Sequence, residues 1–281
     1  MSDDTTLPKF IIFGAVKGAT TWLSYQLQHN PAVFLPDPEP HFFSSEYDRG
    51  FDWYGQFFRD AAPGQLPGEK SADYLAHPDA ARRIAEAVPD IALVVQLRNP
   101  VDRAYSDYRM LYRRGTITGG PEDYLIRSTT TLPRFLDDGL YYQHLRRWFD
   151  HFPREQIKVL LYEDVRERPA WVMQEVCDHI GAPFHFAQEL EHERINDGSA
   201  HLLPLPMRKL LGPLKGAVRP LRGHALFEAA RRTIAQPVRY PPLSASTRAY
   251  MEEFYAGDVE RLASLIGRDL RHWLPAARRA A

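Results

Sequence analysis

The sequence predicts a three-layer α/β fold in which helices flank a central parallel sheet. Three short apolar runs, at residues 10–13, 91–97 and 157–162, have the length and composition of strands. Apolar runs without polar alternation are typical of parallel strands that are buried on both faces. Helical patterns lie between these runs, and strands that alternate with helices indicate a parallel sheet with right-handed crossovers.

The first predicted strand leads through a glycine-containing loop into a helix. The strand stops at Gly14, and the loop carries Lys17 and Gly18. Thr20 and Thr21 then open a segment with apolar residues at helical spacing. The first N–H groups of a helix lack partners within it, so this loop is suited to bind an anion. It differs from the standard phosphate loop GxxxxGK[ST] because the lysine precedes the second glycine. A turn that only lets the helix pack on the sheet remains the alternative.

The composition is that of an ordinary globular protein. The 281 residues are 44% hydrophobic and 25% charged, with a formal net charge of −1. Because there is no overall basic excess, we expect no nucleic-acid partner, and an anion site has to be built locally. The single cysteine, Cys177, leaves no intrachain disulfide and lies in an apolar helical pattern, which predicts a core residue.

The start of the chain is polar and acidic, without the basic and apolar regions of a signal peptide. No window contains the run of about 18 apolar residues that a membrane-spanning helix needs. We therefore expect a cytoplasmic protein without stable membrane insertion.

The segment between the first and second apolar runs has four features. Residues 32–35 predict a short strand. Three prolines within five residues then make a stiff turn that directs Glu39 and His41. The aromatic-rich stretch at 42–58 predicts helices that pack a core, and part of it could wall a pocket for an acceptor. Residues 68–74 are polar and predict irregular structure.

Helix boundaries are indicated most clearly after the second apolar run. Asn99 is a suitable N-cap and Pro100 suits the first turn of a helix that continues to Gly115. Residues 116–133 are polar and predict a surface excursion. The other predicted helices span residues 78–88, 134–149, 169–180 and 246–266, the last capped by Ser244 or Ser246.

The regular alternation breaks down at residues 182–240, which we treat as a variable region of a single domain over residues 1–281. Five arginines make the later part of this region locally basic. It forms either a lid over an anionic ligand or a solvated face. The five are Arg219, Arg222, Arg231, Arg232 and Arg239.

A second anion site is predicted where the 91–97 strand ends at Arg98. Ligands of open α/β sheets bind outside the carboxyl ends of the strands, so Arg98 is expected at the same edge as Lys17. Ser106 lies two turns into the helix that follows, and a guanidinium group can bind a phosphate with two hydrogen bonds. The alternative is a structural arginine that pairs with Asp102 or Glu163.

Two anion sites on one sheet edge imply a ligand with two separated phosphate-like groups. Three residues in the intervening segments, Glu39, His41 and Lys70, are candidates for proton chemistry. For Lys70 the alternative is a salt bridge to Glu69 or Asp73. The eleven histidines are scattered without metal-ligand spacing, so we predict no metal.

Together these motifs resemble the PAPS-dependent sulfotransferases, and most closely the branch that includes the heparan sulfate N- and O-sulfotransferases and their bacterial relatives. The motifs follow the order of the family from about residue 10 to residue 274. The resemblance implies a three-layer P-loop-like fold. The matching segments are residues 16–21, 39–43, 69–74, 97–106, 139–141 and 239–242.

The resemblance implies transfer of the sulfuryl group of 3′-phosphoadenosine 5′-phosphosulfate (PAPS), without a metal, to an acceptor hydroxyl or amine. The acceptor would be a glycan, a lipid or a small metabolite. In such enzymes the 5′-phosphosulfate is bound by the loop, which here comprises Lys17, Gly18, Ala19, Thr20 and Thr21.

The resemblance assigns the 3′-phosphate to Arg98 and Ser106, with Arg239 as the nearby basic residue of the late loop. The chain departs from the glycan-specific members at Ser44, where an acidic residue often stands. It has neither the disulfide nor the membrane anchor that many members carry, which favours a bacterial-type enzyme over a Golgi enzyme.

The same resemblance implies that Glu39 is the general base, that Lys70 stabilises the transferring group or positions the acceptor, and that His41 orients one of them. Two alternatives have different chemistry. A P-loop kinase would use ATP and magnesium, with Asp164 as the candidate acidic metal ligand. The second alternative is a module that binds a nucleotide bisphosphate without catalysing a reaction.

Overall fold

The computed structural model describes residues 7–190 and 237–278. Within these residues the strands form one sheet in the order β2-β3-β1-β4-β5, and every neighbouring pair is parallel. The α/β fold with a central parallel sheet is therefore confirmed. The strands are β1 (Phe10–Gly14), β2 (Val33–Phe34), β3 (Leu66–Lys70), β4 (Ala92–Leu97) and β5 (Ile157–Leu161).

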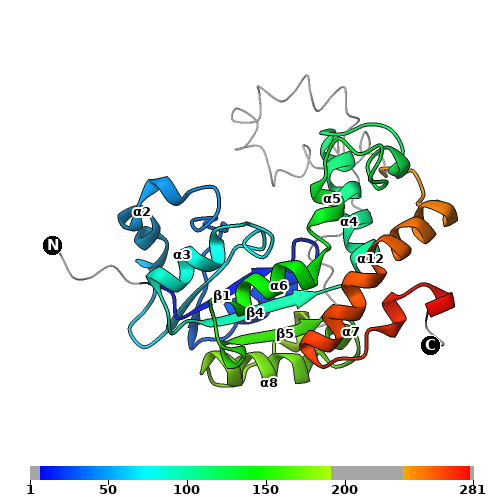
Figure 1. Ribbon diagram of the computed structural model, residues 1–281. Helices are drawn as coiled ribbons and strands as arrows, with labels where there is room; N and C mark the ends of the chain where they lie inside the picture. Colours follow the sequence, from blue (N-terminus) through cyan, green and yellow to red (C-terminus); the bar gives the residue numbers. More distant parts are fainter. Residues whose placement is uncertain (1–6, 191–236, 279–281) are drawn as a thin grey trace.

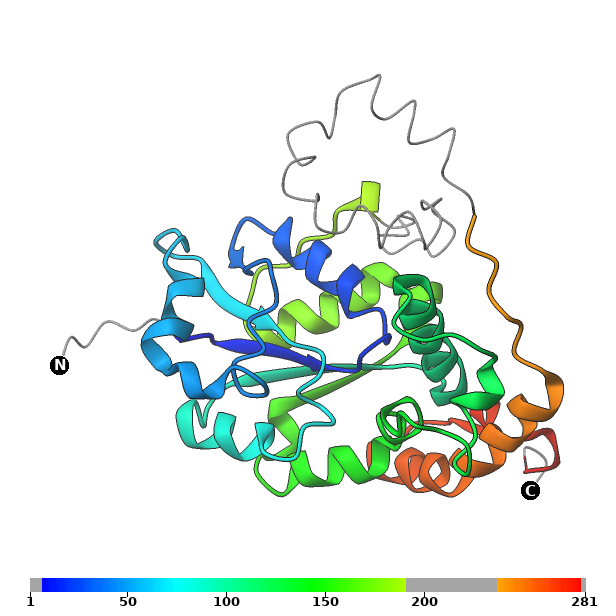
Figure 2. The ribbon, with the colours of Figure 1, turned by 90° about the horizontal axis from the view of Figure 1, so that it is seen from above.

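Helices cover both faces of the sheet and make three layers (Figure 2). Because side chains alternate along a strand, Phe10 and Ile12 of β1 pack on one face, and Ile11 and Phe13 pack on the other. The first face is covered by α1 (Thr20–Gln28) and α8 (Pro169–Ile180). The second is covered by α3 (Ala80–Ala87), α6 (Tyr141–Phe149) and α12 (Ala245–Ile266).

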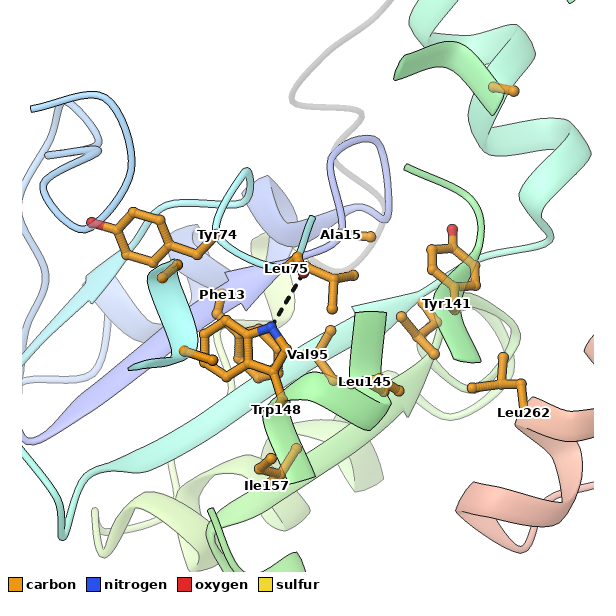
Figure 3. Packing of buried hydrophobic residues seen from close by; sticks show 14 of the residues in the cluster. Phe13, Ala15, Tyr74, Leu75, Val95, Tyr141, Leu145, Trp148, Ile157 and Leu262 are labelled. Atoms are coloured by element: carbon orange, nitrogen blue, oxygen red, sulfur yellow. Dashed lines mark hydrogen bonds between the residues drawn. The ribbon is translucent and has the colours of Figure 1, made fainter. Parts of the chain in front are cut away.

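Trp148 of α6 ties the second layer to the sheet (Figure 3). Its ring stacks on Phe13 with centroids 3.9 Å apart, and its indole N–H donates to the carbonyl oxygen of Leu75 at 3.2 Å. The N–H of Leu75 in turn donates to the Phe13 carbonyl at 2.8 Å. The segment after β3 is thereby held beside the end of β1.

The prediction of irregular structure at residues 68–74 is wrong for its first part, because β3 runs from Leu66 to Lys70 beside β1. Because proline and glycine are rare inside strands, the sequence pattern did not indicate a strand here. Here Pro67 faces the two-residue β2, and Gly68 is needed for space. A Cβ on Gly68 would lie 2.1 Å from the ring of Phe10.

Several predicted helix ends agree with the structure. In α4 (Pro100–Arg114) the Asn99 side chain accepts hydrogen bonds from the first turn, and Gly115 ends the helix at a φ of 76°. The N-cap of α12 is Ser244, whose hydroxyl accepts from the N–H of Thr247 at 3.1 Å. Cys177 is fully buried on α8, as predicted.

The single helix predicted over residues 134–149 is wrong, since the structure has α5 (Arg134–Asp137) followed by α6. The chain breaks at Gly139, which packs against α12. The Tyr255 hydroxyl of α12 donates to the Leu136 carbonyl at 2.9 Å, and a Cβ on Gly139 would lie 2.8 Å from that hydroxyl. A contact from a distant helix therefore decides the break.

The remaining elements are short. The aromatic stretch forms η1 (Tyr47–Arg49), α2 (Phe51–Gly55) and η2 (Gln56–Phe58), with Phe42 and Phe43 fully buried as predicted for a core. The predicted surface excursion at 116–133 buries Ile117 and Leu125. The others are η3 (Pro121–Asp123), η4 (Arg154–Gln156), α7 (Tyr162–Glu167), η5 (Gln188–Leu190), η8 (Arg271–Trp273) and η9 (Ala276–Arg278).

Residues 191–236, most of the predicted variable region, lie outside the described residues, so the lid stays a prediction. On the described part of the chain, no helix combines the length and apolarity needed to cross a membrane. Figure 1 shows α12 lying alongside α4, with β4 and β5 pointing toward this side of the molecule.

Candidate active site

The predicted site residues follow the carboxyl ends of neighbouring strands. Lys70 is the last residue of β3, β1 leads into residues 14–21, which we call the Lys17 loop, and Arg98 directly follows β4. Glu39 and His41 come from the segment after β2. Because β2, β3, β1 and β4 are consecutive in the sheet, these groups occupy one edge in that order.

The Lys17 loop is anchored to β4 through backbone groups and one glutamine. The N–H of Ala15 donates to the carbonyl of Gln96 at 2.9 Å, and the Gln96 side-chain amide donates to the Gly18 carbonyl at 2.6 Å. A Cβ on Gly18 would lie 2.3 Å from the Gln96 carbonyl oxygen, so only glycine fits. Gln96 received no role in the sequence analysis, although its polar side chain stands out within an otherwise apolar strand.

The loop turns into α1 through residues in the left-handed region. Lys17 has a φ of 67° and Ala19 a φ of 72°, and α1 begins with Thr20 and Thr21. The N–H of Gly18 already donates to the Ala15 carbonyl at 2.8 Å. The start of α1 is the part of the loop that suits an anion best, because the helix dipole is favourable there.

Lys17 is largely buried, with both an acidic and two basic side chains nearby. Its ammonium nitrogen is 3.6 Å from the Met110 sulfur on α4. Burial lowers the pKa of Lys17 most, and the nearby charges of Arg114 and Arg98 lower the pKa further, while Asp107 opposes them. The structure thus brings Lys17 into the field of Arg98, and an anion bound there would relieve the repulsion between these cations.

Arg98 makes neither of the ion pairs considered as alternatives. Its guanidinium group lies over the Tyr162 ring, 4.7 Å from the centroid. Asp102 instead pairs with an arginine of α12 at 2.7 Å, and Glu163 accepts a hydrogen bond from the indole of Trp273 at 2.8 Å. Arg98 therefore stays at the strand end with a geometry that suits recognition of a planar or anionic group.

The segment that carries Arg239 is docked along α4, the helix that also carries Ser106. Arg109 lies over the Tyr240 ring at 4.3 Å from the centroid, and the Tyr105 hydroxyl donates to a carbonyl of the same segment at 2.9 Å. Arg239 itself is exposed. Sequence reasoning missed Tyr105 and Arg109, because their partner lies far along the chain.

Glu39 and Lys70 form an ion pair of 2.7 Å. The second carboxylate oxygen of Glu39 accepts a hydrogen bond from the N–H of Ala72 at 3.2 Å. The Lys70 side chain is 12% exposed, so this pair is largely shielded from water on the lysine side. Lys70 thus pairs with Glu39, and not with Glu69 or Asp73.

His41 is joined to the segment after β3 at two points. Its backbone N–H donates to the Ser71 hydroxyl at 2.9 Å, and its ring Nδ1 lies 2.7 Å from Asp73 Oδ1. The other oxygen of Asp73 accepts a hydrogen bond from the Ser44 hydroxyl at 2.6 Å. Residues 39–44 and 69–74, which we call the paired segments, are therefore joined through side chains.

Glu69, which sequence reasoning gave no role, lies at the centre of the paired segments. The fully buried carboxylate accepts hydrogen bonds from Tyr54 at 2.7 Å, Ser71 at 2.9 Å and Tyr74 at 3.1 Å. Burial raises the pKa of Glu69 to about 7, against the opposing effect of these hydroxyl donors. The sequence carries no local signal for this role, because β3 was not predicted and the Glu69 carboxylate is buried only when β3 lies beside β1.

Asp164, the candidate magnesium ligand of the kinase alternative, forms ion pairs with two arginines. It pairs with Arg168 at 2.7 Å and with Arg268 at 2.9 Å, and these bonds lower its pKa although burial opposes them. Across residues 7–190 and 237–278, no three or more His, Cys, Asp or Glu side chains gather as a metal site would require.

The fold and the cationic strand ends define the chain as a P-loop-like α/β protein. A family model described as "Sulfotransferase domain" matches residues 7–203. The chain therefore belongs to the sulfotransferase family, which confirms the resemblance and does not favour the kinase alternative.

Comparison with known proteins agrees with this assignment. A solved sulfotransferase from Alicyclobacillus acidocaldarius superposes with a TM-score of 0.71 at 27% identity, covering 95% of this chain and 99% of that chain. Among curated relatives, the mouse bifunctional heparan sulfate N-deacetylase/N-sulfotransferase 3 is 29% identical over 95% of this chain.

A further relative, the human heparan sulfate glucosamine 3-O-sulfotransferase 3B1, is 33% identical over 64% of this chain. The chain spans 31% of the mouse protein's length and 47% of the human protein's length. It is thus similar to a part of each of these relatives.

Proposed function

We propose that this protein transfers the sulfuryl group of PAPS to a hydroxyl or amine of an acceptor. The observation that carries the proposal is the order of groups along the sheet edge: Glu39 and His41, then Lys70, then the Lys17 loop, then Arg98. This is also the order that an in-line transfer needs, from the acceptor proton through the sulfuryl group to the far phosphate.

The cofactor end of the edge suits two separate anionic groups. In our proposal Lys17, Gly18, Ala19, Thr20 and Thr21 bind the 5′-phosphosulfate. The fit is supported by the helix start at Thr20, where backbone N–H groups and the helix dipole favour an anion, and by the packing of Gly18 on β4, which fixes the position of the loop.

We assign the 3′-phosphate to Arg98, Ser106 and Arg239. The docking of the Arg239 segment on α4 supports this assignment, since it brings that segment to the helix of Ser106. A guanidinium group can hold a phosphate with two hydrogen bonds, which gives position as well as charge.

At the other end of the edge, Glu39 acts as the general base. It accepts the proton of the acceptor hydroxyl or amine while the acceptor atom attacks sulfur and the bond from sulfur to the 5′-phosphate oxygen breaks. Lys17 neutralises the charge that is left on that oxygen, Lys70 stabilises the transferring group, and His41 orients the acceptor or the sulfuryl group.

The names of the relatives, which describe N- and 3-O-sulfotransferases of heparan sulfate, support a glycan acceptor. We propose a glycan acceptor with a free hydroxyl or amine, with a lipid or small metabolite as the other outcomes. Transfer of ³⁵S from labelled PAPS to an amine-bearing glucosaminyl polysaccharide, its N-acetylated form, a glycolipid with a free hydroxyl and p-nitrophenol separates these classes.

Calorimetry with adenosine 3′,5′-bisphosphate (PAP), compared with ATP plus magnesium, tests the cofactor. We expect PAP to bind without metal and Arg98→Ala to weaken it by about tenfold or more, which is about 1.4 kcal/mol. Arg59→Ala, at an exposed arginine outside the matching motif segments, is the matched control and should leave PAP affinity unchanged. Preference for ATP with magnesium would make the kinase the leading hypothesis.

A further inference from the structure

His41 is held in an unusual backbone conformation. Its φ of 52° lies in the left-handed region, which residues other than glycine rarely adopt. The hydrogen bond from its N–H to Ser71 helps to maintain this conformation. Such local strain fixes the direction in which the imidazole projects from the chain.

Both carboxylate oxygens of Asp73 have a hydrogen-bond partner. Oδ1 faces His41 Nδ1 at 2.7 Å, and Oδ2 accepts from Ser44 at 2.6 Å. Burial opposes ionisation, but the bonds from His41 and Ser44 prevail and lower the pKa of Asp73. An ionised carboxylate only accepts hydrogen bonds, so the proton of this contact is on His41 Nδ1.

We propose that Asp73 is a positioning residue for the transfer reaction: it fixes the His41 ring so that Nδ1 faces Asp73 and Nε2 faces the substrate. This inference rests on the proposed function, in which His41 contacts the acceptor or the sulfuryl group. The His41 side chain is 42% exposed, which leaves the ring accessible to a ligand.

The pair also sets the charge of His41. The hydrogen bond to Asp73 is the largest cause of a raised His41 pKa, burial opposes it, and the charges of Asp73, Glu39 and Glu69 raise it further. Lys70, paired with Glu39, is the cation on the adjoining segment. With Nδ1 engaged by Asp73, Nε2 is the ring nitrogen that meets the substrate, while Glu39 accepts the acceptor's proton.

An ion pair with both partners this exposed contributes little to folding stability. Folding stability is therefore a weak measure of this contact, whereas the tautomer and the pKa of the His41 ring report it directly.

The experiment is ¹⁵N NMR of the histidine rings, with the His41 signals assigned from their loss in His41→Gln. In the wild type we expect Nδ1 to carry a proton throughout the titration. In Asp73→Asn we expect the His41 pKa to fall toward the ordinary value of about 6.5 and the neutral ring to populate both tautomers. Asp73→Glu, which keeps the carboxylate, should recover part of the shift.

Two controls separate positioning from general disruption. Asp48→Asn makes the same change at an exposed aspartate nearby in the chain and should leave His41 unchanged. Ser44→Ala removes the other bond to Asp73 but keeps the carboxylate, so the His41 pKa should stay at or above its wild-type value. A fall in Ser44→Ala as large as in Asp73→Asn, or no change in Asp73→Asn, would overturn the proposal.

PAP binding is measured on the same samples and should be unchanged in Asp73→Asn. A wild-type protein that fails to bind PAP would contradict the proposed function, whereas the NMR result depends only on the contact between His41 and Asp73. The two failures are therefore distinguishable.

Discussion

The Lys17 loop and the paired segments lie side by side on the sheet edge but are held by different forces. The Lys17 loop is anchored mainly by backbone groups against β4, with Gly18 filling a place where no side chain fits. The paired segments are joined by side chains around the buried carboxylate of Glu69. In the proposed function, anion binding would thus depend on chain geometry, and proton transfer on the identity and ionisation of a few side chains.

The first prediction has the largest expected effect and tests whether the paired segments act in catalysis while the Lys17 loop binds the cofactor. Glu39→Gln should lower turnover by about 10²–10⁴, the usual contribution of a general base, and leave PAP affinity within a factor of about two. Turnover is measured as ³⁵S transfer and affinity by calorimetry. Glu155→Gln, at an exposed glutamate on η4, is the control. Loss of PAP affinity with intact turnover would reverse the roles of the two regions.

The second prediction concerns the pH dependence of the paired segments. The pKa of Glu69 is raised from 4.5 to about 7 in the fold, so the folded protein binds this proton more tightly than the unfolded chain. The corresponding stability is complete below pH about 4.5 and is lost as the pH rises to about 7, a change of about 3 kcal/mol.

Glu69→Gln removes this titration. Its free energy of unfolding, from urea titrations between pH 5 and pH 8, should therefore fall less with rising pH than that of the wild type. Glu155→Gln should retain the wild-type slope. Equal slopes in Glu69→Gln and the wild type would show that Glu69 titrates normally.

The third prediction concerns the backbone of the Lys17 loop. Gly18→Ala would bring a Cβ to within 2.3 Å of the Gln96 carbonyl oxygen, and a backbone atom cannot easily move away. We expect a stability loss of about 1–3 kcal/mol together with weaker PAP binding. Gly257→Ala in α12, where a Cβ meets open space, should stabilise by about 0.5–1 kcal/mol without changing PAP binding.

The smallest effect should come from the stack that docks the Arg239 segment. Arg109→Ala removes a cation–π contact worth about 0.5–1 kcal/mol and should weaken PAP binding about two- to fivefold. Arg49→Ala removes a similar stack, over Trp53 at 4.5 Å, in the aromatic stretch. If Arg109→Ala and Arg49→Ala weaken PAP binding equally, the docking of the Arg239 segment makes no specific contribution to PAP binding.

Much of the fold was predictable because its signals are local. The buried runs of β4 and β5, the Asn99 cap of α4 and the ends of α8 depend on neighbours within a few residues. The strand β3 was missed because Pro67 and Gly68 are tolerated there only through their sheet neighbours, Phe34 and Phe10. The break at Gly139 was missed because Tyr255 of α12 decides it.

By itself the sequence determined the strand, loop and helix around Lys17 and the position of Arg98 at the end of a strand, since these features are contiguous and depend on local physics. Only the tertiary structure decided which side chains pair. Glu39 meets Lys70 and His41 meets Asp73 because β2 and β3 bring together segments that are about thirty residues apart. Long-range pairing depends on sheet order, which no local pattern encodes.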